Sequence, residues 1–376
     1  MSIVLFDNAY RQKLYPLVAV RAVADLRFGI VTIKERWELI TQQQVFVQTE
    51  KYLGALYEAI PDEEHVWIDA SIIADEDLLQ RILSLQPGEA LQDIHGVVAV
   101  KSSDLNQFDK IIPVNEAKRI VYPWNLFQIN DYMLRKDFEL ITKGRTSQPI
   151  SSSNNICSSE NIFIEEGANV EFATLNASAG PIYIGKNAEV WEGSVIRGTI
   201  AIKENAVIKA GAKIYGATTI GPWCAAGGEI KNAILMGYSN KAHDGYLGDS
   251  VVAHWCNFGA GSSNSNVKNT AGDIMMPDDM TNEKINVGQK CGVMMGDYSR
   301  VAINSSINTG SVIGVCANVF GAGLLPKKIN DFTWGINNEY EFEKAVRDID
   351  NWKRMKHQNI SAKEVEVLKR IFAAKN

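Results

Sequence analysis

The chain has 376 residues, of which 46% are hydrophobic and 22% charged, and its formal net charge is −6. This length exceeds one typical core, so we expect roughly two or three domains, and the negative charge argues against a dedicated nucleic-acid binder. No stretch approaches the ~20 apolar residues that span a membrane, and no basic region of the secretory type precedes Asp7. The five cysteines lack Cys-x-x-Cys spacing, so we expect reduced thiols in a cytoplasmic protein, and neither disulfides nor zinc ligands.

Strands alternate with helices in residues 1–145. The expected elements are strands at 3–6, 65–68 and 96–100 and helices at 37–57 and 76–85. Such alternation is typical of an α/β domain with a mainly parallel sheet. Residues 146–155 are rich in Ser, Pro and Asn and predict a linker.

Residues 156–328 carry a period of six. The aliphatic residues at this spacing are Ile184, Val190, Ile196, Ile202, Ile208, Ile214 and Ile220, followed later by Val301, Ile307, Ile313 and Val319. A hexapeptide period is the mark of a parallel β-helix. It predicts one aliphatic side chain pointing inward from each flat face, with mostly small residues at the corners.

The period is interrupted in the second half of this repeat region. It slips at 227–229 and 241–248, and residues 262–283 form a polar stretch with no period. We expect these breaks to extrude loops, which is where functional residues gather.

Residues 329–376 predict C-terminal helices. Apolar residues line one face of the first, and a capping box formed by Ser361 and Glu364 opens the second. We expect these helices to cap the end of the solenoid against edge-to-edge pairing.

The densest group of reactive side chains lies in the interrupted coils. His243 stands in a glycine-rich polar segment, and Lys231 and Lys241 lie nearby. An imidazole can take a proton from an attacking amine, and the lysines could hold an anionic substrate. Alternatively, His243 is a surface residue without a catalytic role.

These segments resemble a known family. The motifs are Glu229-x-Lys231, Lys241-Ala242-His243-x-x-Tyr246-Leu247-Gly248-Asp249, Asn257-x-Gly259-Ala260-Gly261 and Asn266. They are similar to the acetyltransferase domain of the bifunctional N-acetylglucosamine-1-phosphate uridyltransferase / glucosamine-1-phosphate acetyltransferase family, in a divergent branch with a shortened N-terminal nucleotidyltransferase-like domain. The resemblance implies a left-handed parallel β-helix after the α/β domain.

The resemblance also implies roles for individual residues. His243 would be the general base, and Lys231 and Tyr246 would hold the sugar phosphate. The remaining implied contacts are Glu229, Asn257 and Asn266 to sugar hydroxyls or the amine, Lys213 in place of the family's phosphate-binding arginine, and Gly259, Ala260 and Gly261 beside acetyl-CoA. The similarity ends after Asn266, where Lys268 and Lys284 are candidates only.

The N-terminal domain lacks the glycine-rich loop with which nucleotidyltransferases cradle phosphates. No glycine follows the first strand until Gly29, although Arg11, Arg21 and Arg27 supply positive charge. We predict weak nucleotide binding through these arginines and slow or absent nucleotidyl transfer. Mg²⁺ is implied only if this domain is active, and no dedicated metal ligands are evident.

The predicted function is acetyl-CoA-dependent N-acetylation of an amino-sugar phosphate such as glucosamine 1-phosphate. It would serve the synthesis of nucleotide sugars of the UDP-N-acetylglucosamine type for the cell envelope, in a homotrimer. UTP or another nucleoside triphosphate would be a further substrate if the N-terminal domain is active. The alternatives are a sugar-1-phosphate nucleotidyltransferase with a regulatory β-helix and a non-catalytic trimeric scaffold.

Overall fold

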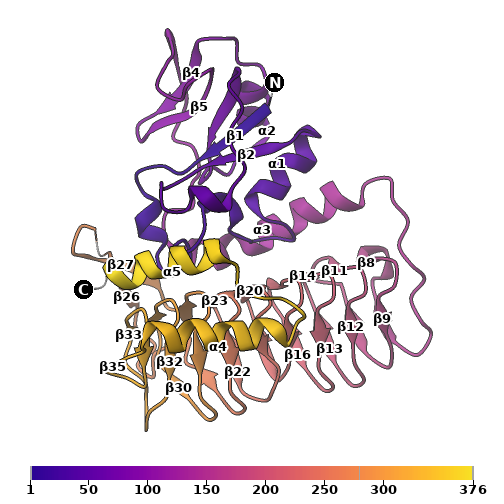
Figure 1. Cartoon of the computed structure of the whole chain (residues 1–376). Helices are drawn as coiled ribbons and strands as arrows, with labels where there is room; N and C mark the ends of the chain where they lie inside the picture. Colours follow the sequence, from indigo (N-terminus) through magenta and orange to yellow (C-terminus); the bar gives the residue numbers. More distant parts are fainter. Residues whose placement is uncertain (1, 279, 375–376) are drawn as a thin grey trace.

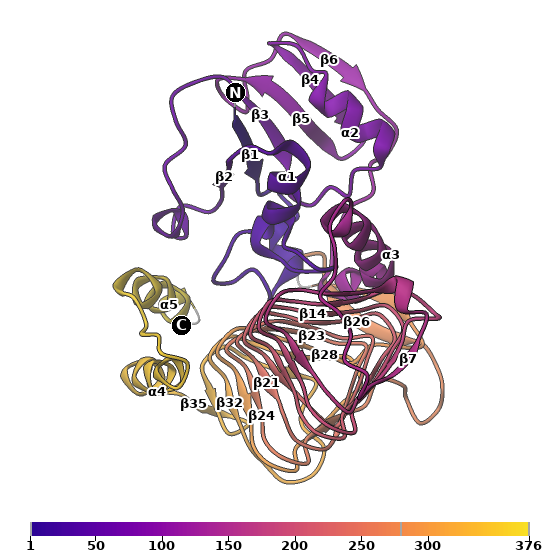
Figure 2. The ribbon, with the colours of Figure 1, turned by 90° about the vertical axis from the view of Figure 1, so that its right-hand side faces the viewer.

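A computed structural model describes residues 2–278 and 280–374. An N-terminal α/β region stands on the side of a long β-solenoid, and two C-terminal helices lie along the solenoid (Figures 1 and 2). The α/β region and the left-handed β-helix therefore confirm the predicted fold class. None of the helices formed by the described residues combines the length and apolar character of a membrane-crossing helix.

The N-terminal region contains one mixed sheet. Its strands, in spatial order, are β2 (Val45–Gln48), β1 (Ser2–Phe6), β3 (His65–Asp69), β5 (Gly96–Ser102), β4 (Glu89–Asp93) and β6 (Lys110–Pro113). Its helices are α1 (Ile33–Thr41), α2 (Glu76–Leu83) and α3 (Pro123–Thr142). β1 runs parallel to β2 and β3, whereas β5 is antiparallel to both β3 and β4. A tight turn before Gly96 joins β4 to β5.

The prediction of one helix over 37–57 is wrong. Gln42 ends α1 in the left-handed conformation, with φ of 53°. The residues that follow include two valines and a phenylalanine, which suit a pleated strand, and Val45 pairs with Ile3 of β1. Residues 54–56 then form one turn of 3-10 helix. The long helix α3, which the sequence reasoning did not anticipate, packs on the solenoid beside β17 and β23.

Three long parallel sheets form the sides of the solenoid, called faces A, B and C here. Face A contains β22 (Tyr246–Gly248), β19 (Glu229–Lys231), β16 (Lys213–Tyr215), β13 (Val195–Arg197), β10 (Thr174–Asn176) and β7 (Asn155–Cys157). Face B contains β33 (Lys328–Ile329), β31 (Ser311–Ile313), β28 (Val293–Met295), β23 (Val251–His254), β20 (Ile234–Gly237), β17 (Thr218–Ile220), β14 (Ile200–Ile202), β11 (Ile182–Ile184) and β8 (Ile162–Ile164). Face C contains β35 (Asn338–Glu339), β34 (Thr333–Trp334), β32 (Asn318–Val319), β29 (Arg300–Val301), β24 (Asn257–Phe258), β21 (Asn240–Lys241), β18 (Ala225–Ala226), β15 (Val207–Ile208), β12 (Glu189–Val190) and β9 (Asn169–Val170).

The six-residue period places one aliphatic side chain on the inside of each face. Ile196 lies on face A, Ile202 on face B and Ile208 on face C, and each is fully buried. Each coil of the regular part stacks on the next, so that Ile202 pairs with Ile220, eighteen positions on. Because alternate residues of a strand point to opposite sides, the residues flanking each aliphatic face outward.

Two of the predicted breaks do not extrude loops. Residues 227–228 are a short turn before β19, which begins at Glu229, and residues 241–248 span the end of β21, a tight turn and β22. The coil accommodates the break in period by shortening, since Ile220 pairs with Leu235, fifteen positions on. The sequence motifs therefore stay on the solenoid surface instead of projecting from it.

The aperiodic stretch after residue 262 does leave the solenoid. After β25 (Ser263–Asn264), which pairs with β30 (Ser306–Ile307), it forms an antiparallel hairpin of β26 (Ile274–Asp278) and β27 (Glu283–Gly288). The hairpin packs against the N-terminal region, where Asp278 Oδ2 accepts hydrogen bonds from Lys13 Nζ at 2.8 Å and Tyr122 OH at 3.0 Å.

The C-terminal helices are α4 (Phe342–Arg354) and α5 (Ala362–Ala374). The predicted capping box is present, because Ser361 and Glu364 exchange backbone-to-side-chain hydrogen bonds at 2.8 and 3.2 Å. The prediction that these helices cap the end of the solenoid is wrong, because they run along its side (Figures 1 and 2). They bury the aromatic residues that follow the strands of face B, such as Trp255 and Tyr298. These aromatic side chains would otherwise face solvent, so the helices cover the side of the solenoid that carries them. The end of face C is closed instead by the antiparallel strand β35, which pairs with β34.

The three faces consequently have different environments. Face B is covered by the N-terminal region, whose core continues onto Ile234, Met236 and Val251. The edge between faces B and C is covered by α4 and α5. Face A and the edge that joins it to face C, called the C–A edge here, keep exposed side chains. Most of the residues singled out in the sequence lie on that open side.

Candidate active site

Face A presents a column of polar side chains. The inward residues Ile214, Ile230 and Leu247 are fully buried, so their neighbours in the strands point outward. Strand register aligns Lys213 with Glu229, and Glu229 with Tyr246. A second outward column aligns Tyr215 with Lys231 and Gly248. Four of the predicted substrate-binding residues are therefore brought together on neighbouring strands.

Hydrogen bonds link these side chains to residues that the sequence reasoning missed. Tyr215 OH donates to Glu229 Oε1 at 2.5 Å, and this bond, with burial, raises the pKa of Tyr215 to about 12. Lys231 Nζ lies 5.7 Å from the centre of the Tyr215 ring. The alternation of β16 could have identified Tyr215, since it lies two residues after Lys213 on the same side of the strand.

Asn266 joins the same surface through its amide. Its Nδ2 donates to Tyr246 OH at 3.1 Å and to Asp249 Oδ2 at 2.5 Å, while Asn232 Nδ2 donates to Asp249 Oδ1 at 2.7 Å. Burial, and then the charge of Asp249, raises the pKa of Tyr246. Both phenols on this face are therefore protonated at neutral pH and can donate hydrogen bonds. Asp249 ends the recognised motif, although no role was assigned to it from the sequence.

His243 lies on the C–A edge, in the turn between β21 and β22. Its side chain is exposed, and its imidazole makes no hydrogen bond or ion pair with any of the described residues. One coil further along the same edge lie Gly259, Ala260 and Gly261, and Gly261 N donates to Asp244 O at 3.1 Å. The structure thus places the predicted base directly beside the segment predicted to lie along acetyl-CoA.

The structure of the solenoid itself explains why glycine occupies positions 259 and 261 on this edge. A Cβ at Gly259 would lie 2.3 Å from the backbone nitrogen of Ile303, and one at Gly261 would lie 2.1 Å from Asn304 Oδ1. Close stacking of the backbones therefore excludes a side chain at Gly259, whereas at Gly261 the left-handed backbone, with φ of 74°, favours glycine. Their contact with acetyl-CoA stays a prediction that the glycine identity does not support by itself.

Asn257 is separated from the other substrate-binding candidates. It lies on face C, where it pairs with Asn240 and Arg300. The C-terminal segment flanks it, because the Trp352 ring packs 5.2 Å from the Arg300 guanidinium and Lys356 Nζ donates to Asn240 Oδ1 at 3.2 Å. His243 and the glycines lie on the edge between Asn257 and face A. A ligand that contacts both Asn257 and the candidate residues of face A must reach around this edge or lie between two chains.

The two candidate lysines follow the recognised motif in the chain. Lys268 donates to the carbonyl of Asp273, and Lys284 is on β27 of the hairpin. Among residues 2–278 and 280–374, no group of three or more His, Cys, Asp or Glu side chains is arranged to hold a metal ion.

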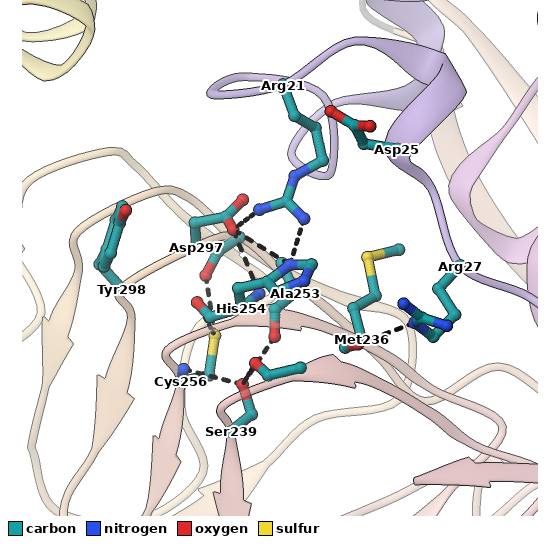
Figure 3. Close-up of polar contacts among 12 residues, drawn as sticks. Arg21, Asp25, Arg27, Met236, Ser239, Ala253, His254, Cys256, Asp297 and Tyr298 are labelled. Carbon is teal, nitrogen blue, oxygen red and sulfur yellow. Dashed lines mark hydrogen bonds and ion pairs between the residues drawn. The ribbon is translucent and has the colours of Figure 1, made fainter. Parts of the chain in front are cut away.

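The N-terminal arginines are buried and engaged within the chain. Arg11 pairs with Asp7 at 2.9 Å, and Arg27 donates to the Met236 carbonyl at 3.2 Å. Arg21 crosses to the solenoid, as Figure 3 shows, and contacts Asp297 and His254.

Arg21 and Asp297 are buried where they meet. Burial lowers the pKa of His254 well below its usual value, and Arg21 and Arg27 lower it further, so the imidazole is neutral. Nucleotide binding by these arginines stays a prediction, and it would compete with the contacts that join the two parts of the chain.

A separate cavity of about 460 Å³ lies at the N-terminal region, beside the segment that follows β1. Its lining includes Tyr10, Lys13, His95, Lys118 and Arg119. Three of its basic groups already have acidic partners. Lys13 pairs with Asp278, His95 Nε2 lies 3.0 Å from Glu116 Oε1, and Arg119 pairs with Asp93 at 2.5 Å. The cavity is large enough for a small molecule, although it lacks a cluster of free cations.

Comparison with known proteins identifies relatives for both parts of the chain. A family profile described as sugar nucleotidyl transferase matches residues 3–146. A bifunctional sugar-1-phosphate nucleotidylyltransferase/acetyltransferase from Sulfurisphaera tokodaii is 29% identical over 102 residues, covering 27% of this chain and 25% of the relative. The bifunctional protein GlmU of a Cyanothece species is 23% identical over 232 residues, covering 58% and 49%. The GlmU of Methanococcus vannielii is 26% identical over 206 residues, covering 55% and 43%.

Solved structures show similarity at a lower level. A putative acetyltransferase from Bacillus cereus is 15% identical, with a TM-score of 0.27, covering 60% of this chain and 98% of that one. The polysialic acid O-acetyltransferase OatWY is 19% identical, with a TM-score of 0.24, covering 50% and 86%. The matches span about half or less of the curated relatives' length. The family profile and the curated relatives confirm the predicted similarity to the bifunctional family that joins a sugar-1-phosphate nucleotidyltransferase to an acetyltransferase.

Proposed function

We propose that the solenoid transfers an acetyl group from acetyl-CoA to the amine of an amino-sugar phosphate. The observation that carries this proposal is the arrangement on the open side of the solenoid. Two lysines and a set of hydrogen-bonding groups share face A, and an exposed histidine lies on the adjoining edge. A purely structural solenoid needs none of these side chains there.

Each group has a chemical role in this proposal. Lys213 and Lys231 attract the phosphate, and Glu229 and Asn266 hydrogen-bond the sugar. The imidazole of His243 accepts a proton from the amine of the sugar as the amine nitrogen bonds to the thioester carbon. The carbon–sulfur bond then breaks, and the departing thiolate of coenzyme A takes up the proton from the imidazolium.

The position of Asn257 supports a homotrimer. It lies across the C–A edge from face A, so one copy alone presents a divided site. The same edge carries exposed apolar side chains, with Phe172 64% and Ile303 69% exposed. Closed threefold symmetry would bring face A of one chain against face C of the next. Light scattering at micromolar concentration should give three times the mass of the chain, and a monomeric mass would contradict this part of the proposal.

The test of the activity is direct. The protein is incubated with acetyl-CoA and a panel of amino-sugar phosphates, and free thiol is followed. We expect turnover with a glucosamine 1-phosphate-like acceptor and a much higher KM for the same sugar without its phosphate, because Lys213 and Lys231 then lack their partner. Thiol release that is independent of acceptor, or none with any acceptor, would contradict the proposal.

A second activity, sugar-1-phosphate nucleotidyl transfer, is favoured by the match of residues 3–146 to sugar nucleotidyl transferases. We propose that it is slow or absent in this chain. The segment after β1 is a 3-10 turn of residues 11–14 with no glycine, and Lys13 within it pairs with Asp278 of the hairpin. Backbone amides that cradle phosphates need the close approach that glycine permits.

A further inference from the structure

Lys241 is a charged residue inside the solenoid. It lies in β21, where strand register pairs it with Ala226, and Ala226 continues a column through Ile208 and Val190. The other members of this inward column are apolar and buried, and Lys241 is itself only 1% exposed. The ammonium group therefore occupies a position that aliphatic side chains fill in neighbouring coils.

The surroundings of this ammonium are unfavourable for its charge. Burial lowers the pKa of Lys241 to about 8, and only the nearby charge of Asp244 opposes the effect. Its Nζ makes one hydrogen bond with the described residues, to the carbonyl oxygen of His243 at 2.5 Å. A buried, incompletely paired ammonium destabilises a fold. Packing alone therefore does not account for a lysine at this position.

The single hydrogen bond acts on the turn that carries His243. The carbonyl of His243 is held inward by Lys241 and lies against Gly228, where a Cβ would come within 2.7 Å of it. The next carbonyls of the turn accept hydrogen bonds from the adjoining coils, Asp244 O from Gly261 N and Gly245 O from Glu229 N, each at 3.1 Å. The backbone is thus tied from inside and from both sides, while the imidazole remains exposed.

We propose that Lys241 is a positioning residue that holds the His243 turn from within the solenoid core. This inference rests on the proposed acetyl transfer for its catalytic consequence. Lys241 lies on the inner side of the sheet and contacts neither the sugar phosphate nor the thioester. Its effect is therefore on the placement of the base, and misplacement of a catalytic group by about 1 Å can cost on the order of a hundredfold in rate.

The test compares Lys241→Met with the control Ile208→Met, which changes an apolar residue of the same column. Methionine keeps the length of the lysine stem and removes the ammonium. In Lys241→Met we expect kcat for acetyl transfer to fall roughly tenfold to a hundredfold, with both KM values within about threefold. The melting temperature should equal or exceed that of the unmodified protein, because an unfavourably buried charge has been removed.

Hydrogen exchange supplies a readout that needs no substrate. The amides of Glu229 and Gly261, which bond to the turn, should exchange faster in Lys241→Met and unchanged in Ile208→Met. If the unmodified protein transfers no acetyl group, the proposed function fails while the exchange measurement still decides whether Lys241 holds the turn. Unchanged exchange, a kcat within about twofold, or a misfolded or less stable Lys241→Met would each overturn the inference.

Discussion

The N-terminal region and face A of the solenoid use their charged side chains in opposite ways. In the N-terminal region Arg11, Arg21 and Arg27 are buried, and each is engaged with a carboxylate or a carbonyl of the chain. On face A, Lys213 is exposed, and neither Lys213 nor Lys231 forms an ion pair with the described residues, although Lys231 lies 5.7 Å from the centre of the Tyr215 ring. The first arrangement holds the molecule together, whereas the second leaves cations available for an anionic ligand.

This difference in pairing indicates which of the two regions has cations available to bind a substrate. Positive charge is an equally conspicuous feature of both regions in the sequence. Only burial and pairing separate cations that stabilise an interface from cations that can bind a substrate. We therefore expect substitutions in the two regions to affect different properties, and the following experiments test that separation.

The largest effect is expected on face A and its edge, from His243→Ala. Loss of a positioned general base should lower turnover in acetyl transfer by roughly 10²–10⁴. Folding should be unaffected, because the side chain is exposed and makes no hydrogen bond or ion pair with the described residues. Thiol release and thermal melting measure the two properties. Transfer that survives within about threefold would show that His243 is not the base.

The converse result is expected from Arg21→Met at the interface with the N-terminal region. The substitution leaves the buried carboxylate of Asp297 without its cation, and its second oxygen already has no partner among the described residues. Breaking a buried pair costs about 3–5 kcal/mol of the free energy of unfolding, measured by urea titration. Turnover in acetyl transfer should stay within about threefold, since His243 lies on a different edge.

The double variant Arg21→Met/Asp297→Leu is the control for this prediction. Removing both charges also removes the unpaired carboxylate, so much of the lost stability should return. Equal destabilisation by the single and double variants would mean that the pair matters through packing alone.

A smaller effect is expected in the pH dependence of stability. Burial lowers the pKa of Lys241 to about 8, whereas a lysine in the unfolded chain titrates near 10.4. Between these values the unfolded state binds more protons, so the contribution of Lys241 to stability rises with pH. The advantage of Lys241→Met over the unmodified protein should be about 3 kcal/mol at most at pH 7 and should shrink by pH 10. An advantage that does not change with pH would show that the pKa of Lys241 is the same in the folded and the unfolded protein.

The smallest signal is expected from nucleotidyl transfer. With UTP, Mg²⁺ and N-acetylglucosamine 1-phosphate, release of pyrophosphate should stay below the ordinary enzyme range, which begins near ~1 s⁻¹. The reason is that the segment after β1 lacks glycine and its arginines are already engaged. Turnover at or above that rate would show that cations of the N-terminal region serve a ligand after all, and the contrast between the two regions would fail.

Local patterns predicted the solenoid and much of its candidate site. The solenoid can be recognised from a local period of six, because each aliphatic residue fills an equivalent inward-facing position in its coil. Most residues of the motif from Glu229 to Asn266 lie on the open side of the solenoid, since strand register carries regular spacing into space. The helix predicted over 37–57 failed for the opposite reason, because pairing of Val45 with Ile3 decided between helix and strand.

What the sequence determined by itself was therefore the repeating part of the molecule and the residue types available for chemistry. The tertiary structure alone decided which of them are free to act. Arg21 and Asp297 meet although 276 positions separate them, and Asn257 lies across an edge from the residues with which its motif groups it. Such contacts leave no local signature, because they depend on which surfaces of the folded chain cover one another. Burial by distant segments is what makes one cation a structural partner and leaves another exposed for a ligand.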